Sequence, residues 1–199
     1  MLAYIKGILE IKNSNYIVID VQGLGYKVIM SETAINKLPN IGEIVKVYTH
    51  YHVREDDISI FGFNTNEELR LFDLLISVSG VGAKSAINML SNISPSEFAI
   101  AIINDDTSKL VKIPGIGAKS AARIVLELKD KLKKEEAIIT ENIHNKVEKQ
   151  QNDDTEEAVA ALQVLGYQKK DIEKAMEKIN IAGCTVEDII KKSLSMLAR

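Results

Sequence analysis

Residues 80–86 read Gly-Val-Gly-Ala-Lys-Ser-Ala, and residues 115–121 read Gly-Ile-Gly-Ala-Lys-Ser-Ala. Six of the seven positions are identical, and the two copies are 35 residues apart. A match of this length, flanked by helix-like sequence, predicts a duplicated structural unit. We expect each copy to be a tight glycine turn that leads into a helix, with Val81 or Ile116 buried as its anchor.

These residue types suit the binding of phosphate. Glycine allows a tight turn and a close approach to another surface. A helix that starts after the turn directs its unpaired N–H groups toward an anion. A lysine adds positive charge to each copy, and Arg123 lies one turn after Lys119 on the same helix face. We predict two base-independent DNA clamps formed by Gly80, Val81, Gly82, Lys84, Ser85, Gly115, Ile116, Gly117, Lys119, Ser120 and Arg123.

Other glycine motifs fit the two copies less well. A nucleotide-binding P-loop needs a glycine directly before the lysine, where Ala83 and Ala118 stand. A dinucleotide fingerprint needs a third glycine at the positions of Ser85 and Ser120, and it needs a preceding strand. The remaining alternative is a pair of helix–helix turns in which glycine serves packing alone.

Charge and composition place the basic residues in the middle of the chain. The 199 residues have a net charge of −3, but residues 79–134 contain nine basic and five acidic residues. A local basic excess is what a nucleic-acid interface requires. Cys184 is the single cysteine, so no intrachain disulfide can form. The N-terminus lacks a signal-peptide pattern and no stretch resembles a membrane span, so we expect a cytoplasmic protein without a cofactor.

The hydrophobic pattern divides the chain into a β part and a helical part. Four strands can be assigned within residues 1–63, and we expect about five in all. A set of this size favours a small closed barrel of the OB type. Thr65 and the pair Ser94-Pro95 are typical helix starts. From the N-terminus, the expected strands are residues 16–21, 26–30, 44–53 and 58–63, and the expected helices are 67–78, 83–91, 95–103, 106–111 and 118–133, with three more within 155–197.

A polar stretch separates the last helices from the rest. It has few apolar residues to bury and is typical of a flexible linker. The predicted architecture is α+β and multi-domain. Its parts are an OB-like barrel (1–64), an all-α domain with the two glycine turns (65–142), a flexible linker (143–153) and a three-helix bundle (154–199).

The repeated stretch looks like a pair of helix-hairpin-helix motifs. Placed after a barrel and before a linked bundle, the pair resembles the RuvA family of Holliday-junction branch-migration subunits, over the whole chain. The motifs that carry this resemblance are Val53-Arg54-Glu55-Asp56, Phe61-Gly62-Phe63, Ile113-Pro114-Gly115-Ile116-Gly117 and Leu165-Gly166-Tyr167.

The resemblance implies a non-catalytic subunit for recombination, DNA repair and the response to DNA damage. It implies a homotetramer, single or stacked in pairs, that holds a four-way junction open and square. The hairpins would contact the minor-groove backbone, and an acidic pin of Glu55 and Asp56 would repel phosphates at the crossover. The bundle would recruit the hexameric ATPase RuvB through Leu162, Leu165, Gly166 and Tyr167. The resolvase RuvC would be a further partner.

The residues alone leave alternatives open. Arg54 to Asp57 lie between two strands, so they form a hairpin tip that an ordinary solvated turn also explains. A helix-hairpin-helix DNA repair glycosylase would need a Lys or Asp beside a deep base pocket, and a nuclease would need carboxylates that hold Mg²⁺, for which Glu55, Asp56 and Asp57 are the candidates. An OB-type binder of single strands is the other alternative. His50 and His52 are too few for a metal site, so we predict no metal.

Overall fold

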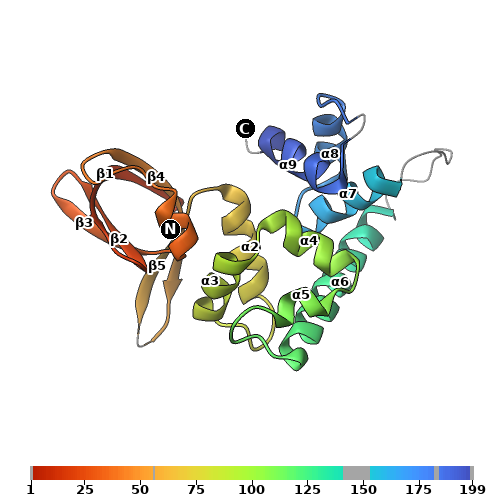
Figure 1. Ribbon diagram of the computed structural model, residues 1–199, viewed down its shortest axis with the longest axis horizontal. Coiled ribbons are helices and arrows are strands. Elements are labelled where there is room, and N and C mark those ends of the chain that lie inside the picture. Colours follow the sequence, from red (N-terminus) through yellow and green to blue (C-terminus); the bar gives the residue numbers. More distant parts are fainter. Residues whose placement is uncertain (1, 56, 141–152, 182–183, 198–199) are drawn as a thin grey trace. The chain divides into compact units, whose positions relative to one another are not determined.

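The computed structural model describes residues 2–55, 57–140, 153–181 and 184–197 of the chain (Figure 1). The chain divides into two compact units. The first contains residues 1–76 and 82–93, and the second contains residues 77–81 and 94–199. The strands lie in the first unit, and the C-terminal helices lie in the second.

The strands of the first unit close into a barrel with the order β1-β2-β3-β5-β4 (Figure 1). Neighbouring strands are antiparallel except β3 and β5, which pair in parallel through Ile29 and Phe61. The predicted OB-like barrel is confirmed. Its strands are β1 (Tyr4–Lys12), β2 (Tyr16–Val21), β3 (Leu24–Ile29), β4 (Ile44–Val53) and β5 (Ile58–Phe63).

Strand β1 was not assigned from the sequence, because polar residues and a glycine interrupt its pattern. A Cβ at Gly7 would lie only 2.1 Å from the carbonyl oxygen of Asp20, so the crossing of β1 and β2 requires glycine. Ile5 and Leu9 nevertheless point into the barrel core. A bulge between Leu9 and Ile11 further disturbs the alternation on which strand prediction relies.

Helix α1 (Glu32–Asn36) was also not predicted from the sequence, because five residues are too few to show a helical hydrophobic period. Ser31 caps this helix: its Oγ accepts a hydrogen bond of 3.2 Å from the N–H of Ala34. Ala34 and Ile35 are buried in the barrel's hydrophobic core. The short helix therefore contributes apolar side chains to the core of the barrel.

Helices α2 (Asn66–Ile76) and α3 (Ala83–Asn92) complete the first unit. The predicted cap Thr65 is confirmed, since its Oγ1 accepts a hydrogen bond of 3.2 Å from Glu68 N–H. Phe72 of α2 is fully buried, and its ring contacts those of His50, Phe61 and Phe63. These ring contacts hold α2 against β4 and β5.

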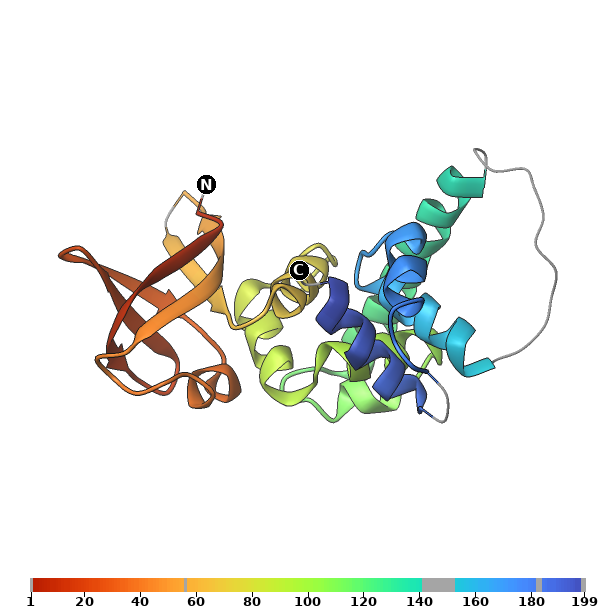
Figure 2. The same cartoon turned by 90° about the horizontal axis from the view of Figure 1, so that it is seen from above.

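The second unit begins with three helices that follow the predicted pattern. They are α4 (Pro95–Ile103), α5 (Thr107–Val111) and α6 (Ala118–Thr140). Helix α6 was predicted to end at residue 133, but it continues to Thr140 (Figure 2). The Ile138-Ile139 pair therefore extends the preceding helix. The predicted linker starts beyond this point, and residues 143–152 lie outside the described residues.

The predicted three-helix bundle is confirmed as α7 (Asp153–Val164), α8 (Lys169–Met176) and α9 (Val186–Leu197). Gly166 ends α7 with φ +81°, and the N–H of Tyr167 donates to Leu162 O at 3.2 Å. This pattern is a Schellman-type helix end, in which glycine avoids the strain of a left-handed backbone.

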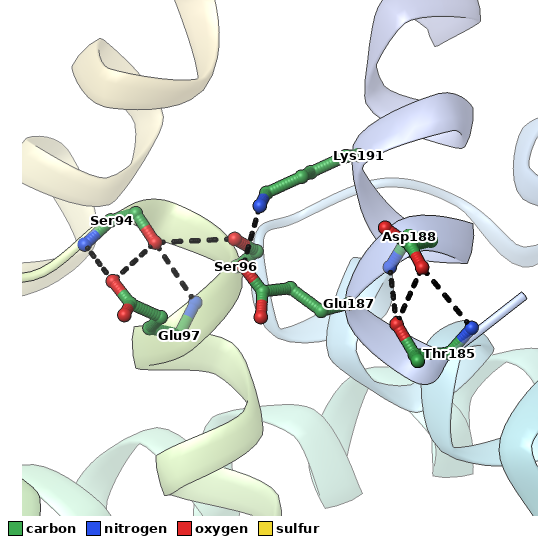
Figure 3. Close-up of polar contacts among 7 residues, drawn as sticks. All are labelled: Ser94, Ser96, Glu97, Thr185, Glu187, Asp188 and Lys191. Atoms are coloured by element: carbon green, nitrogen blue, oxygen red, sulfur yellow. Dashed lines mark hydrogen bonds and ion pairs between the residues drawn. The ribbon is translucent and has the colours of Figure 1, made fainter.

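Helix α4 packs against α7 and α9 within the second unit. Asn104, at the end of α4, donates a hydrogen bond of 3.0 Å to Glu157 Oε1 of α7. At the other end, Ser94 and Glu97 form a capping box near the start of α9 (Figure 3). Helix α4 is apolar around most of its circumference, which fits a helix that is packed on several sides. No single helix in the described ranges is long and apolar enough to cross a membrane.

Candidate nucleic-acid interface

The two glycine turns have the same backbone conformation. Gly80 has φ +83° and Gly115 has φ +84°. The same hydrogen bonds recur 35 residues apart: Val81 N–H to Val78 O at 3.1 Å and Ile116 N–H to Ile113 O at 3.0 Å, then Ala86 N–H to Gly82 O at 3.0 Å and Ala121 N–H to Gly117 O at 2.9 Å. The repeat in the sequence is therefore a repeat in structure.

The side chains of the turns divide into buried anchors and exposed polar groups. Val81 is 9% exposed and Ile116 is 7% exposed, which confirms both predicted anchors. Lys84 and Ser85 are exposed in the first copy, as are Lys119 and Ser120 in the second. The anchors fix the turns in the fold, while the lysines and hydroxyl groups face solvent.

The second glycine of each copy is not required by the fold. Gly82 has φ −89°, which any residue adopts, and Gly117 also lies outside the left-handed region. A Cβ at either position would meet nothing within 4 Å. Glycine at these positions thus leaves open space in front of the helix start, where an external surface could approach the backbone.

The first turn is braced by helix α6. Arg123 donates from Nη1 to the carbonyl oxygen of Ser79 at 3.3 Å, and Glu127 accepts from the N–H of Ser79 at 3.1 Å. The sequence analysis predicted a DNA contact for Arg123 but missed this bracing and the roles of Ser79 and Glu127. The spacing of four residues places Arg123 and Glu127 on one helix face, but it does not reveal what they contact.

The lysines of the turns carry charge that is not neutralised by a described neighbour. Lys84 and Lys119 form no ion pair with any carboxylate that the structure describes, nor does Arg123. Gly82 caps α3 without a side-chain hydrogen bond, so no side chain among the described residues caps the N–H groups of its first turn. Amide donors and a nearby lysine together form a favourable environment for an anion.

Glu55, predicted to belong to an acidic pin, lies at the tip of the β4–β5 hairpin. The ladder between the strands ends at Val53 and Ile58, which confirms the predicted hairpin tip. Arg54 N–H donates to Asp57 O at 2.8 Å and closes the turn. Glu55 is exposed, and Asp56 lies outside the described residues. Asp57 accepts a hydrogen bond of 2.6 Å from the hydroxyl group of Ser59.

The two histidines of β4 contact protein side chains. His50 Nδ1 lies 2.8 Å from Asp73 Oδ1, and His52 Nε2 accepts a hydrogen bond of 2.9 Å from Arg54 Nε. Burial lowers the pKa of His52, and the charges of Arg54 and His50 lower it further. A neutral imidazole at neutral pH can accept this hydrogen bond. Among the described residues, no three His, Cys, Asp or Glu side chains could hold a metal ion.

The residues predicted to contact a motor lie at the end of α7. Leu162 and Leu165 are fully buried and Tyr167 is 8% exposed, whereas Gly166 is exposed. The side chains of the other three residues therefore belong to the core of the bundle. A partner protein could reach Gly166 without repacking of the bundle.

A closed barrel, paired glycine hairpins with exposed lysines and a C-terminal three-helix bundle define a multi-domain protein of the helix-hairpin-helix class. Three family models match the chain in the same order. Residues 1–62 match the RuvA N terminal domain, residues 72–130 match the SAM-like Helix-hairpin-helix tandem, and residues 153–198 match the RuvA C-terminal domain.

Full-length relatives agree with these matches. The chain is 48% identical to the Holliday junction branch migration complex subunit RuvA of Acetivibrio thermocellus and 43% identical to that of Ruminiclostridium cellulolyticum. They cover 100% and 99% of it, over 100% of their own lengths. The same subunit from Clostridium perfringens is 40% identical with full coverage of both chains. The chain belongs to the RuvA family, and these relatives are named as subunits of the Holliday junction branch migration complex.

Proposed function

We propose that this chain binds four-way junction DNA as a homotetramer and holds the junction open and square. It recruits the RuvB ATPase, which supplies the energy for branch migration in recombination and DNA repair, and it works with the resolvase RuvC. The observation that supports this proposal most directly is the pair of hairpins with one backbone conformation and exposed lysines. The relatives' names as subunits of the branch migration complex support it as well.

Each hairpin would hold the sugar-phosphate backbone of one stretch of DNA. The amides at the start of the helix donate to phosphate oxygens, and Lys84 or Lys119 adds a charge-assisted contact. Arg123, which bonds to Ser79 beside the first hairpin, would add a second cation to the contact of that hairpin. Because none of these groups reads a base edge, binding would not depend on sequence. Each neutralised phosphate contributes about −0.9 to the log–log slope of affinity against salt on duplex DNA.

The acidic pin would act through assembly. One Glu55–Asp56 pair is a small charge, but a fourfold axis would gather at least eight carboxylates near the crossover. Two like charges 4 Å apart repel by about 1 kcal/mol even in bulk water. A cluster of this density would keep phosphates away from the centre and would guide the separating strands outward.

The bundle would connect the DNA-bound subunit to the motor. Leu162 and Leu165 would hold the α7–α8 loop in place from inside the bundle, and Gly166 would lie at the contact surface. In this role the buried leucines position the loop, and exposed residues around Gly166 contact the ATPase.

A competition experiment tests the proposal. The purified chain is titrated with labelled four-way junction while single strand, duplex and unlabelled junction compete. We expect the junction to compete far better than the other two, and we expect light scattering to give a mass of four or eight times 22.0 kDa. Equal competition by single strands would contradict the proposal. Cleavage of the junction in Mg²⁺ without a partner would favour a nuclease instead.

A further inference from the structure

The first unit contains a pocket of about 770 Å³ between the barrel and the start of α3. Residues from β2 to β5 line it on one side, and residues 82–87 line it on the other. Its volume lies in the range of about 300–1,000 Å³ that is typical of pockets for small organic ligands. The pocket includes Lys84 of the first hairpin, but most of its lining residues belong to the barrel. The DNA contacts proposed for the two hairpins give these barrel residues no role.

Three cationic side chains line this pocket: Lys27, Arg54 and Lys84. Lys27 lies over the ring of Tyr16, with Nζ 4.4 Å from the ring centre. Arg54 is held by its hydrogen bond to His52. None of the three forms an ion pair with a described carboxylate.

The charges in the pocket favour an anion. Asp57 is the one described carboxylate in the lining, and Ser59 already donates a hydrogen bond to it. Among the described lining residues, three cations against one carboxylate leave an excess of positive charge, and the aromatic ring and the imidazole hold two of the cations in place.

The pocket also has apolar lining residues on both sides. Ile29, Met30 and Phe61 form the barrel side, and Ala83 and Ile87 form the helix side. An inorganic ion would leave this surface uncovered. A nucleotide would fill both parts, because its phosphate would contact the cations while its sugar and base would cover the apolar wall.

We propose that this pocket binds one unpaired nucleotide of a DNA strand. The inference rests on the proposed function, because Lys84 belongs to the first hairpin and Arg54 adjoins the acidic pin. A strand held at that hairpin and repelled at the pin would pass the pocket between them. The barrel would then take part in DNA binding beside the helices.

Two variants and one control test this proposal. Lys27→Gln removes one cation, and Asn15→Trp narrows the pocket at its rim without removing any cation. Lys46→Gln is the matched control, because Lys46 also lies over tyrosine rings of the barrel, at 4.6 and 4.8 Å from their centres, but does not line the pocket. Lys27→Gln and Lys46→Gln lower the net charge equally.

The first measurement compares junction and plain duplex. We expect Lys27→Gln to weaken binding to the junction about tenfold, as for one lost charge-assisted contact. Asn15→Trp should also weaken it, because the indole ring would occupy space that the nucleotide needs. Duplex binding should change little, because a continuous duplex offers no unpaired nucleotide. If the wild-type chain does not prefer the junction, the proposed function fails. If it does and Lys27→Gln behaves as Lys46→Gln, the pocket inference alone fails.

The second measurement follows the nucleotide itself. A 2-aminopurine base is placed next to the crossover, and acrylamide quenching of its fluorescence is measured. We expect the wild type and Lys46→Gln to shield the base, and the two pocket variants to leave it open to quenching. Equal quenching in all four proteins would overturn the proposal.

Two further experiments test whether the pocket binds a free nucleotide or a second subunit instead of a DNA strand. ATP and thymidine monophosphate are added at constant ionic strength, and displacement of the junction from the wild type alone would show a site for free nucleotides instead. Light scattering is repeated on each variant. A changed mass in Lys27→Gln would assign the pocket to contacts between subunits, whereas unchanged masses and no displacement support the strand.

Discussion

At the scale of single residues, glycine has two separate roles in each hairpin. Gly80 and Gly115 have φ near +83°, a backbone conformation in which a Cβ is strained. Gly82 and Gly117 have no such requirement and face open space. The first glycine of each copy therefore serves the fold, and we assign the second to the approach of DNA.

Alanine at each glycine separates these roles. We expect Gly80→Ala and Gly115→Ala to lower the free energy of unfolding by about 1–2 kcal/mol, the cost of a left-handed residue with a side chain. Gly82→Ala and Gly117→Ala should lower the free energy of unfolding less than the first pair, because only the preference for glycine over alanine at a helix start is lost, and yet they should bind junction DNA more weakly. Strong destabilisation by Gly82→Ala would refute the assignment.

A lysine substitution tests the backbone contact itself. Lys119→Ala should weaken binding similarly for every DNA sequence and should make the salt slope shallower by about one unit. Lys112→Ala is the control, since Lys112 is an exposed lysine of the same basic segment outside the hairpins. The measurement is the affinity of each variant for two DNA molecules of unrelated sequence, from low to moderate salt. A loss confined to one sequence would argue against a backbone clamp.

At the scale of an element, α4 depends on its first turn. Ser94 Oγ accepts a hydrogen bond of 3.3 Å from Glu97 N–H, and Glu97 Oε2 accepts one of 2.9 Å from Ser94 N–H (Figure 3). This capping box satisfies two N–H groups that the helix leaves unpaired. Because α4 packs against α7 and α9, its start also supports the bundle.

We expect Ser94→Ala to lower the free energy of unfolding by about 1 kcal/mol, as for other lost helix caps. Ser91→Ala serves as the control, because Ser91 Oγ donates to Ile87 O within a helix and caps nothing. Urea denaturation followed by circular dichroism gives both values. Equal midpoints for the two variants would show that the cap contributes little.

The same cap makes stability depend on pH. The hydrogen bonds from the Ser94 side chain and backbone lower the pKa of Glu97 below its ordinary value of 4.5. An acid with a lowered pKa stabilises the fold fully above its unfolded pKa, and this stabilisation is lost as pH falls through the folded pKa. Stability should thus decline below about pH 4.5, and Glu97→Gln should reduce the decline. Unfolding curves of both proteins are measured between pH 3 and pH 6. An equal decline in stability in the wild type and in Glu97→Gln would show that the cap does not cause it.

At the scale of the whole molecule, the barrel and hairpins would bind DNA while the bundle would bind the motor. A chain that ends near residue 145 lacks all three bundle helices. We expect this chain to keep its preference for the junction and to lose stimulation by RuvB. Both are measured with the same labelled junction. Loss of junction binding would show instead that the bundle, which packs on α4, helps to form the DNA-binding surface.

The sequence by itself determined the barrel, the paired hairpins, the caps at Thr65 and Ser94 and the helix end at Gly166. These features are encoded locally, because a turn, a cap or a hydrophobic period depends on a few neighbouring residues. Strand β1 was missed for the same reason, since Gly7 is explained by a strand that lies further along the chain.

Only the tertiary structure decided which distant residues meet. It placed Arg123 on Ser79, Leu162 and Leu165 inside the bundle, and Lys27 in one pocket with Arg54 and Lys84. Such contacts join residues tens of positions apart. They follow from how strands and helices pack, because periodicity shows which face of an element is buried but not the partner against which it packs.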